Sequence, residues 1–257
     1  MTKKKGSNPG GDQMSFWDHL DVLRGTLIRS LAWLCAFTAL GLAFRDPLFE
    51  IVLAPTRQDF IVYRLLGWDF GMSLVNIEIS AQFFVHLRAA AGAGLVLAFP
   101  LIIWEIWKFI RPALYEGETR AVRTAFLLSS LLFYFGVVFG YLVVLPVCLQ
   151  FFMNYTVSPD IVNTITLGSY MGMFTSMVLL IGVVFEFPAV LSMLSRIGVL
   201  DRGTLRKGRR YAVVAVLILA ALITPSDPFS MIVLALPLYG LYELSILLCK
   251  PTKAASE

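Results

Sequence analysis

Residues 104–118 read WEIWKFIRPALYEGE and join two long apolar segments of the chain. Trp104 and Trp107 are typical of the level at which a membrane-spanning helix reaches the lipid headgroups. Pro112 should interrupt the helix, because the residue before a proline is disfavoured in the α region. Two glutamates then close the stretch, the second of them Glu118. The stretch therefore predicts a connection between two membrane helices that carries negative charge on an otherwise basic surface.

The composition indicates an integral membrane protein. The chain has 257 residues, of which 58% are hydrophobic and only 15% charged. Charged residues make up about 25% of an average soluble domain. Residues 1–13 are polar and basic and lack the apolar core and cleavage site of a signal peptide, so they are predicted to be a disordered tail. Cys35, Cys148 and Cys249 are too far apart for a disulfide framework or a metal site.

Apolar periodicity predicts an amphipathic helix over 15–26 that lies along the membrane interface. Six spans follow, at about 27–44, 83–103, 125–145, 170–194, 211–223 and 231–249. The loop between the first two spans should carry short interfacial helices. The fifth span has about 13 apolar residues, or about 20 Å, against a hydrocarbon core of about 30 Å. It therefore requires a thinned bilayer or partners that cover its ends.

The distribution of basic residues predicts the orientation. Of the 21 Lys and Arg residues, only Arg45, Arg57, Arg64 and Arg88 fall outside if the N-terminus is cytoplasmic. Cytoplasmic loops carry the excess of Lys and Arg in membrane proteins. Both termini are therefore expected in the cytoplasm.

Sequence signatures of an enzyme are missing. The chain has no GxxxxGK[ST] motif, and the glycines at 92 and 94 lack the rest of a dinucleotide-binding pattern. His19 and His86 fall in elements on opposite sides of the membrane. We expect no catalytic site, no metal, no cofactor and no nucleic-acid partner.

Several carboxylates have both a structural and a functional interpretation. Glu186, in the middle of a span, is either a protonated side chain hydrogen-bonded between helices or a polar point in a water-accessible cavity. Glu116 could simply pair with Arg120 on a helix surface, and Asp21 with an arginine three residues further on. Asp227 could cap the last helix.

Five blocks together resemble the TatC family, the receptor subunit of the twin-arginine protein translocase. The blocks, in family order, are HLDVLR (19–24), FIRPALYEGE (109–118), FYFGVVFGYLVVLP (133–146), VVFEFP (183–188) and TPSDPFS (224–230). The resemblance covers the chain from Met14 to about Cys249. It implies recognition of signal peptides with paired arginines and export of folded proteins, driven by the proton-motive force across the bacterial cytoplasmic membrane.

The resemblance also implies roles for individual residues. Glu118 would be the main carboxylate that holds the arginine pair. The remaining implied signal-peptide-binding residues are Asp21, Glu116, Phe109, Pro112, Tyr115 and Leu20. Glu186 would lie inside a concave face, and the outer loops would contribute Pro55 and Asp227.

The sequence departs from the family pattern in its first block. The family's acid in this block falls on Val22, with Asp21 one place earlier. One residue corresponds to a rotation of about 100° on a helix. The second acceptor for the arginine pair is therefore Asp21, Asp18 or Glu116.

The predicted fold is all-α: a polytopic membrane protein whose six transmembrane helices form a concave cup, with the last two helices short. The transmembrane domain covers 14–249, followed by a cytoplasmic tail at 250–257. Expected partners are signal peptides, TatA- and TatB-like single-span proteins, further copies of the chain and the lipid bilayer. Two alternatives are a proton-coupled secondary transporter that uses Glu186 and a structural scaffold of a membrane assembly.

Overall fold

The structure is a computed structural model that describes residues 16–110, 119–158, 160, 163–196, 198–224 and 227–249. The helices that form the bundle are α1 (Phe16–Ala43), α4 (Ala81–Ile110), α5 (Thr119–Phe139), α6 (Leu145–Asn154), α7 (Leu167–Val184), α8 (Phe187–Arg196), α10 (Arg209–Ile223) and α11 (Pro228–Leu248). In this part of the chain, five helical segments are long and apolar enough to cross a membrane. The bundle is therefore that of a multi-pass membrane protein.

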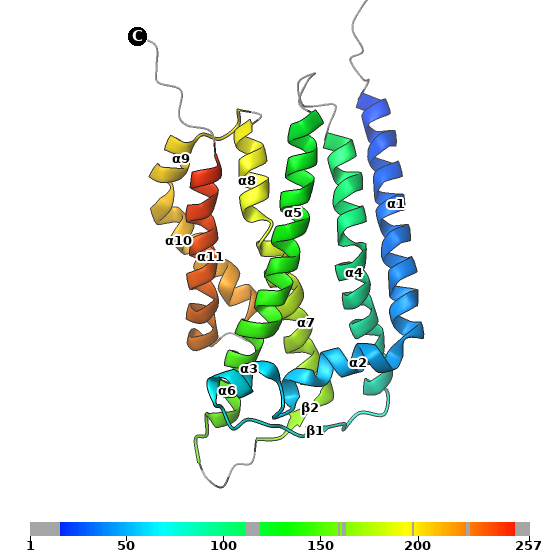
Figure 1. The fold of residues 1–257 in the computed structure, drawn as a ribbon, viewed down its shortest axis with the longest axis vertical. Helices are drawn as coiled ribbons and strands as arrows, with labels where there is room; N and C mark the ends of the chain where they lie inside the picture. Colours follow the sequence, from blue (N-terminus) through cyan, green and yellow to red (C-terminus); the bar gives the residue numbers. More distant parts are fainter. Residues whose placement is uncertain are drawn as a thin grey trace, which may run out of the picture.

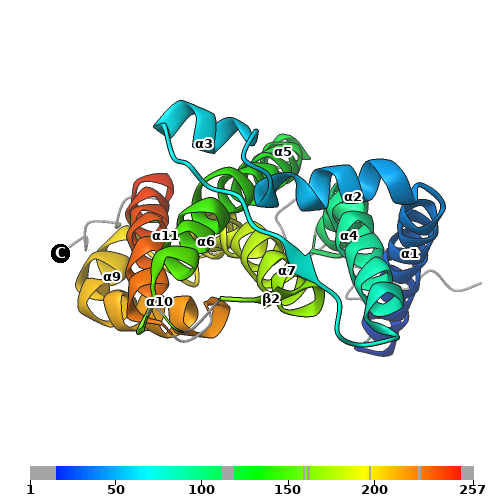
Figure 2. The ribbon, with the colours of Figure 1, turned by 90° about the horizontal axis from the view of Figure 1, so that it is seen from below.

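The two ends of the bundle differ in construction (Figure 1). At one end, which we call the terminal end, α1 begins, α4 ends and α11 ends, and the short α9 (Arg202–Lys207) precedes α10. The opposite end, which we call the loop end, holds α2 (Arg45–Leu53), η1 (Ala54–Thr56), α3 (Ile61–Leu66) and two paired strands. The strands, β1 (Leu74–Val75) and β2 (Ile165–Thr166), are parallel. Seen from the loop end, α1 and α4 lie at one edge, α5 and α7 in the middle, and α10 and α11 at the other edge (Figure 2).

The first helix differs from its prediction. The sequence predicted an interfacial helix over 15–26 and a separate span, whereas α1 is one helix of 28 residues. Its first half contains no proline and one glycine, Gly25, so nothing interrupts the hydrogen-bond ladder. The prediction of a separate interfacial helix is therefore wrong.

Proline positions explain two further differences. The third span was predicted to end at residue 145, just before Pro146, but the helix continues through the π-helical segment η3 (Gly140–Val144) into α6. In η3, the Leu145 N–H donates to the Gly140 carbonyl five residues back, so the helix absorbs the local mismatch next to the proline. The predicted fourth span is instead divided into α7 and α8, just before Pro188.

The last two helices differ in length. α10 has 15 residues, whereas α11 has 21 and continues through Pro237. At 1.5 Å per residue these lengths correspond to about 22 Å and about 31 Å. Only α10 is therefore shorter than the hydrocarbon core, which corrects the prediction of two short final helices.

Three tyrosine hydroxyls hold the loop end together. Tyr141 donates to the Ile51 carbonyl at 2.8 Å and Tyr170 to the Val52 carbonyl at 2.6 Å. Both acceptors are in the last turn of α2, and the Ile51 carbonyl also accepts the Ala54 N–H. Tyr63 on α3 donates to the carbonyl of Pro55 in η1, the segment that precedes α3. Burial raises the pKa of the Tyr63 hydroxyl above its ordinary value. These bonds fasten α2 and η1 onto the bundle.

Small residues allow α5 to cross α7 closely. A methyl group added at Gly136 would lie 2.7 Å from the Phe185 side chain and 2.9 Å from Gly182. Phe133 on the same face of α5 is fully buried and stacks on Phe99 of α4, with ring centroids 3.5 Å apart. The middle of the bundle is therefore built on a close α5–α7 contact.

We predict that Gly136→Ala lowers the free energy of unfolding by about 1–3 kcal/mol, because the added methyl group overpacks this contact. The matched control is Gly240→Ala on α11, where a methyl group would meet nothing within 4 Å. That change should be neutral or stabilising by up to about 1 kcal/mol. Thermal unfolding of both variants in detergent measures the difference, and equal effects would contradict the packing argument.

Candidate functional site

The predicted signal-peptide site lies at and beyond the terminal end of α4. Phe109 is the next-to-last residue of α4 and is half-buried. Pro112, Tyr115, Glu116 and Glu118 lie outside the described residues. The structure therefore gives the helix end from which this loop leaves.

α1 brings a carboxylate to the same level. Asp21 and Leu20 are both exposed near the start of α1, which runs antiparallel to α4 (Figure 1). Arg29 of α1 contacts Glu105 of α4. From this contact, Asp21 lies about 12 Å further toward the terminal end, and the last residue of α4 lies about 7.5 Å further. Asp21 is therefore close to the level at which α4 ends.

Helical rotation separates the neighbouring residues of α1. On an ideal helix Val22 lies about 20° from Arg29, Asp21 about 80° and Leu20 about 180°. Thr38, which lies against Gly94 of α4, marks the face of α1 that packs on α4. On an ideal helix Leu20 lies in line with Thr38 and Asp21 about 100° from it, so Leu20 is on the side of α4 and Asp21 is not.

Sequence reasoning missed Glu105, a buried carboxylate of this end that is paired with two cations. Its side chain belongs to a membrane helix and is only 8% exposed. The Arg29 Nε donates to Glu105 Oε2 at 2.8 Å, and the Lys108 Nζ donates to Oε1 at 3.2 Å. Lys108 also lies over the Trp104 ring, 5.7 Å from its centroid. One buried carboxylate thus joins α1 to α4.

The sequence indicates only one of the two ion pairs of Glu105. Glu105 and Lys108 are three residues apart on one helix, a spacing that allows pairing. Arg29 is 76 residues from Glu105, and no local pattern connects them.

A second correction concerns Trp107, which is 6% exposed and packs inside the protein, whereas Trp104 is 41% exposed. Only Trp104 is free to face lipid.

Glu186 lies in the break between α7 and α8. Ser129 of α5, itself buried, is in hydrogen-bonding reach of the carboxyl group. The other carboxyl oxygen, Oε1, is buried and has no hydrogen-bond partner among the described residues. The contact with Ser129 supports the interpretation of a side chain held between helices, and the water-accessible cavity stays a prediction.

The two outer-loop residues have structural contacts. Pro55 is buried in η1, and its carbonyl accepts the Tyr63 hydroxyl at 2.8 Å. Asp227 caps α11, since its Oδ1 accepts the Ser230 N–H at 2.6 Å. Its Oδ2 is buried without a partner among the described residues. Capping, one of the two interpretations of Asp227, is therefore what its geometry supports.

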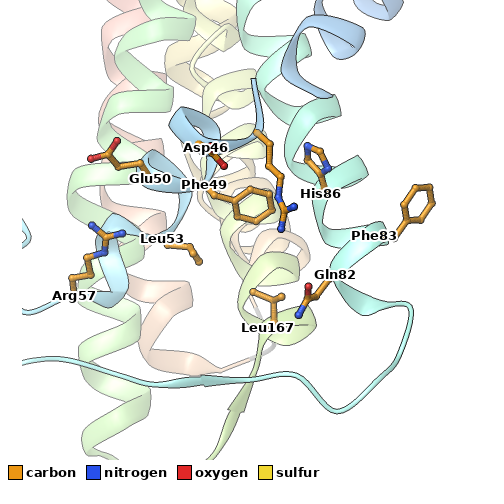
Figure 3. Close-up of a pocket in the computed structure, with 10 residues that line it drawn as sticks. Asp46, Phe49, Glu50, Leu53, Arg57, Gln82, Phe83, His86 and Leu167 are labelled. Carbon is orange, nitrogen blue, oxygen red and sulfur yellow. The ribbon is translucent and has the colours of Figure 1, made fainter. Parts of the chain in front are cut away.

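A polar pocket of about 660 Å³ lies between α2 and α4 at the loop end (Figure 3). Glu50 of α2 and His86 of α4 are among its lining residues, and the His86 ring lies 5.6 Å from that of Phe49. Within the described part of the chain, no three His, Cys, Asp or Glu residues gather to hold a metal ion. The pocket contains none of the predicted site residues.

The apolar helices, the buried ion network and the carboxylate of α1 at one end define a multi-pass α-helical membrane protein with a charged site at its terminal end. A family model described as "Sec-independent protein translocase protein (TatC)" matches residues 18–237. The chain belongs to the TatC family.

Individual relatives agree with this assignment. The chain is 36% identical over 235 residues to the Sec-independent protein translocase protein TatC of Deinococcus radiodurans, which covers 91% of this chain and 85% of the relative. It is 31% identical to that of Escherichia coli K12, over 89% of this chain and 85% of the relative. A crystal structure of a twin-arginine translocase receptor TatC covers 90% of this chain and 99% of the solved chain, with 30% identity and a TM-score of 0.78.

We predict that Arg29→Gln destabilises the protein more than Glu105→Gln does. The first change leaves a buried carboxylate with one cation, whereas the second removes the buried charge itself. Breaking a buried pair from one side costs up to about 3–5 kcal/mol, and the half-exposed Arg29 places this pair at the lower end of the range or below it. The double variant should be no less stable than Arg29→Gln alone.

Unfolding of the three variants in a detergent–denaturant titration measures these differences. Arg64→Gln is the matched control, because the Arg64 side chain is exposed and forms no hydrogen bond or ion pair with the described residues. If Glu105→Gln proves the most damaging of the three, the buried-charge argument is wrong.

Proposed function

We propose that this protein is the signal-peptide receptor of a twin-arginine translocase. It binds the paired-arginine motif of exported proteins and supports transport of folded proteins across the bacterial cytoplasmic membrane, driven by the proton-motive force. One observation carries the proposal: the chain matches a solved TatC receptor over 90% of its length, at 30% identity and a TM-score of 0.78. Family membership favours this function over the proton-coupled transporter.

The arginine pair docks at the terminal end. Glu118 accepts one guanidinium group, and Asp21 or Glu116 accepts the other. A guanidinium group matches a carboxylate with two parallel N–H donors, so two adjacent arginines require two acceptors at once. The exposure of Asp21 near the level where α4 ends supports its part in this pair.

The loop after α4 shapes the site. Phe109, Pro112 and Tyr115 set its conformation, and Leu20 contributes an apolar contact from α1. The apolar part of the signal peptide then moves along the bundle toward Glu186. The Oε1 of Glu186, which has no hydrogen-bond partner among the described residues, supports a role as a polar point for this segment.

The short helix α10 supports an interface with TatA- and TatB-like single-span proteins. Its length of 15 residues leaves it shorter than the hydrocarbon core. Several of its apolar side chains are exposed, among them Val213, Val214, Ile218 and Leu222. Partner helices beside α10 and α11 would cover them, and further copies of the chain complete the receptor complex.

The termini face the cytoplasm in this proposal, so the terminal end is the cytoplasmic end. Of the 21 Lys and Arg residues, all but Arg45, Arg57, Arg64 and Arg88 then lie on the inner side. The signal peptide would meet the receptor on this side before transport.

The test of the site is binding of a twin-arginine signal peptide to the purified protein. We expect Glu118→Gln to weaken binding by at least tenfold, because truncating one member of a hydrogen-bonded charge pair costs about 2 kcal/mol or more. Asp21→Asn should weaken it less. A peptide with two lysines in place of the arginines should bind the wild type weakly, since lysine lacks the planar fork.

The matched control is Glu50→Gln, which removes an exposed carboxylate at the loop end and should leave peptide binding unchanged. Unchanged binding by the double variant Glu118→Gln, Asp21→Asn, with normal membrane levels, would remove both residues from the site. Loss of export with intact peptide binding would instead indicate a structural scaffold.

A further inference from the structure

Arg88 is a charged residue inside the span formed by α4. It lies seven residues from the first residue of that helix, or about 10 Å along its axis. Its side chain is exposed and forms no hydrogen bond or ion pair with the part of the chain that the structure describes. An ionised side chain at membrane depth normally faces a cavity and has a partner. Arg88 has the cavity but lacks the partner.

The cavity is a cleft of about 540 Å³ bounded by three helices, α1, α4 and α7. Arg88 lies at the edge of the cleft nearest the loop end. Deeper along the helices the walls are largely apolar, including Leu34, Leu95 and Leu179. Thr175 of α7 also lines the cleft, and its hydroxyl is buried without a partner among the described residues.

The guanidinium group reaches from α4 to α7. A methyl group added at Gly172 would lie 3.7 Å from Arg88 Nη1, so the absence of a side chain there leaves room for the arginine. Gly172 is five residues from the start of α7, or about 7.5 Å along it. The charge therefore lies a short distance inside the loop end of the bundle, within reach of the lipid headgroups for a long flexible side chain.

We propose that this cleft is a binding site for one phospholipid. The lipid phosphate accepts hydrogen bonds from the Arg88 guanidinium group, and one acyl chain lies in the cleft between α1, α4 and α7. A phosphate matches the fork of donors that Arg88 leaves free. The largely apolar walls beside a free guanidinium group match the acyl chain and the phosphate of one lipid molecule.

The bound lipid has a structural consequence. α1 packs along α4 and is separated from α7 by the cleft. A chain in the cleft would touch both α1 and α7, so it would support α1 from its otherwise uncovered side. This inference is independent of signal-peptide binding.

The experiment is native mass spectrometry of the purified, delipidated protein titrated with phosphatidylglycerol. Wild type should retain one tightly bound lipid. Arg88→Gln should weaken binding of that lipid by about tenfold or more, because it removes charge-assisted hydrogen bonds to the phosphate. Ala91→Phe, which fills the cleft from α4 and keeps the arginine, should weaken it as well.

The matched control is Arg64→Gln, which removes an exposed arginine at the same end of the molecule and should retain the lipid. Melting temperatures in lipid-free detergent establish that each variant is folded, and Arg88→Lys tests the charge in a more conservative change. Inorganic phosphate in large molar excess should not displace the lipid, because the acyl chain contributes to binding.

Each of the following results would overturn the proposal. The first is lipid retention by Arg88→Gln equal to that of wild type. The second is an equal loss in Arg64→Gln, which would indicate a general effect of charge. The third is displacement by inorganic phosphate, and the fourth is undiminished binding by Ala91→Phe, because in either case the cleft would hold no chain.

Discussion

Polar groups inside a bilayer have to find their partners in the protein or in a lipid, because hydrocarbon offers none. Glu105 satisfies this constraint with Arg29 and Lys108, at 2.8 and 3.2 Å. Glu186 satisfies half of it with a serine of α5, and Arg88 finds no partner among the described residues. The degree of pairing separates their roles: the paired group fixes two helices, whereas the unpaired groups mark places where a ligand is needed.

The amino-acid sequence predicts the class of fold well, because composition and apolar run length are local properties. The membrane helices and the short α10 follow from them directly. The errors fall at prolines and helix junctions. Pro146 reads as a helix end, yet the π-helical segment before it lets the helix continue to Asn154. The division at Glu186 also lies beside a proline, Pro188. Proline therefore accompanies a helix end at one position and a continuous helix at another. Tertiary packing decides between these outcomes.

The site is predictable only in part. Carboxylates beside a membrane stand out in the sequence, and the resemblance to a family orders them by role. Glu105 did not stand out, because its main partner comes from another helix, and a lone glutamate near a lysine has an ordinary surface interpretation. From the sequence Arg88 is only one of four arginines on the outer side, and the cleft and Gly172 reveal its surroundings. The partners of Glu105 and the surroundings of Arg88 depend on contacts between segments that are distant in the sequence.

The pairing of α1 with α4 explains how two distant parts of the proposed receptor site are held together. α1 packs along α4 and otherwise touches α2 near its own end. The two helices meet closely at Gly94, where a methyl group would lie 2.7 Å from the Thr38 backbone nitrogen, and again at the Glu105 network. Two separated contacts fix the direction of a rigid helix, whereas one would leave it free to pivot. Asp21 on α1 and the loop that leaves α4 are therefore positioned by the same element.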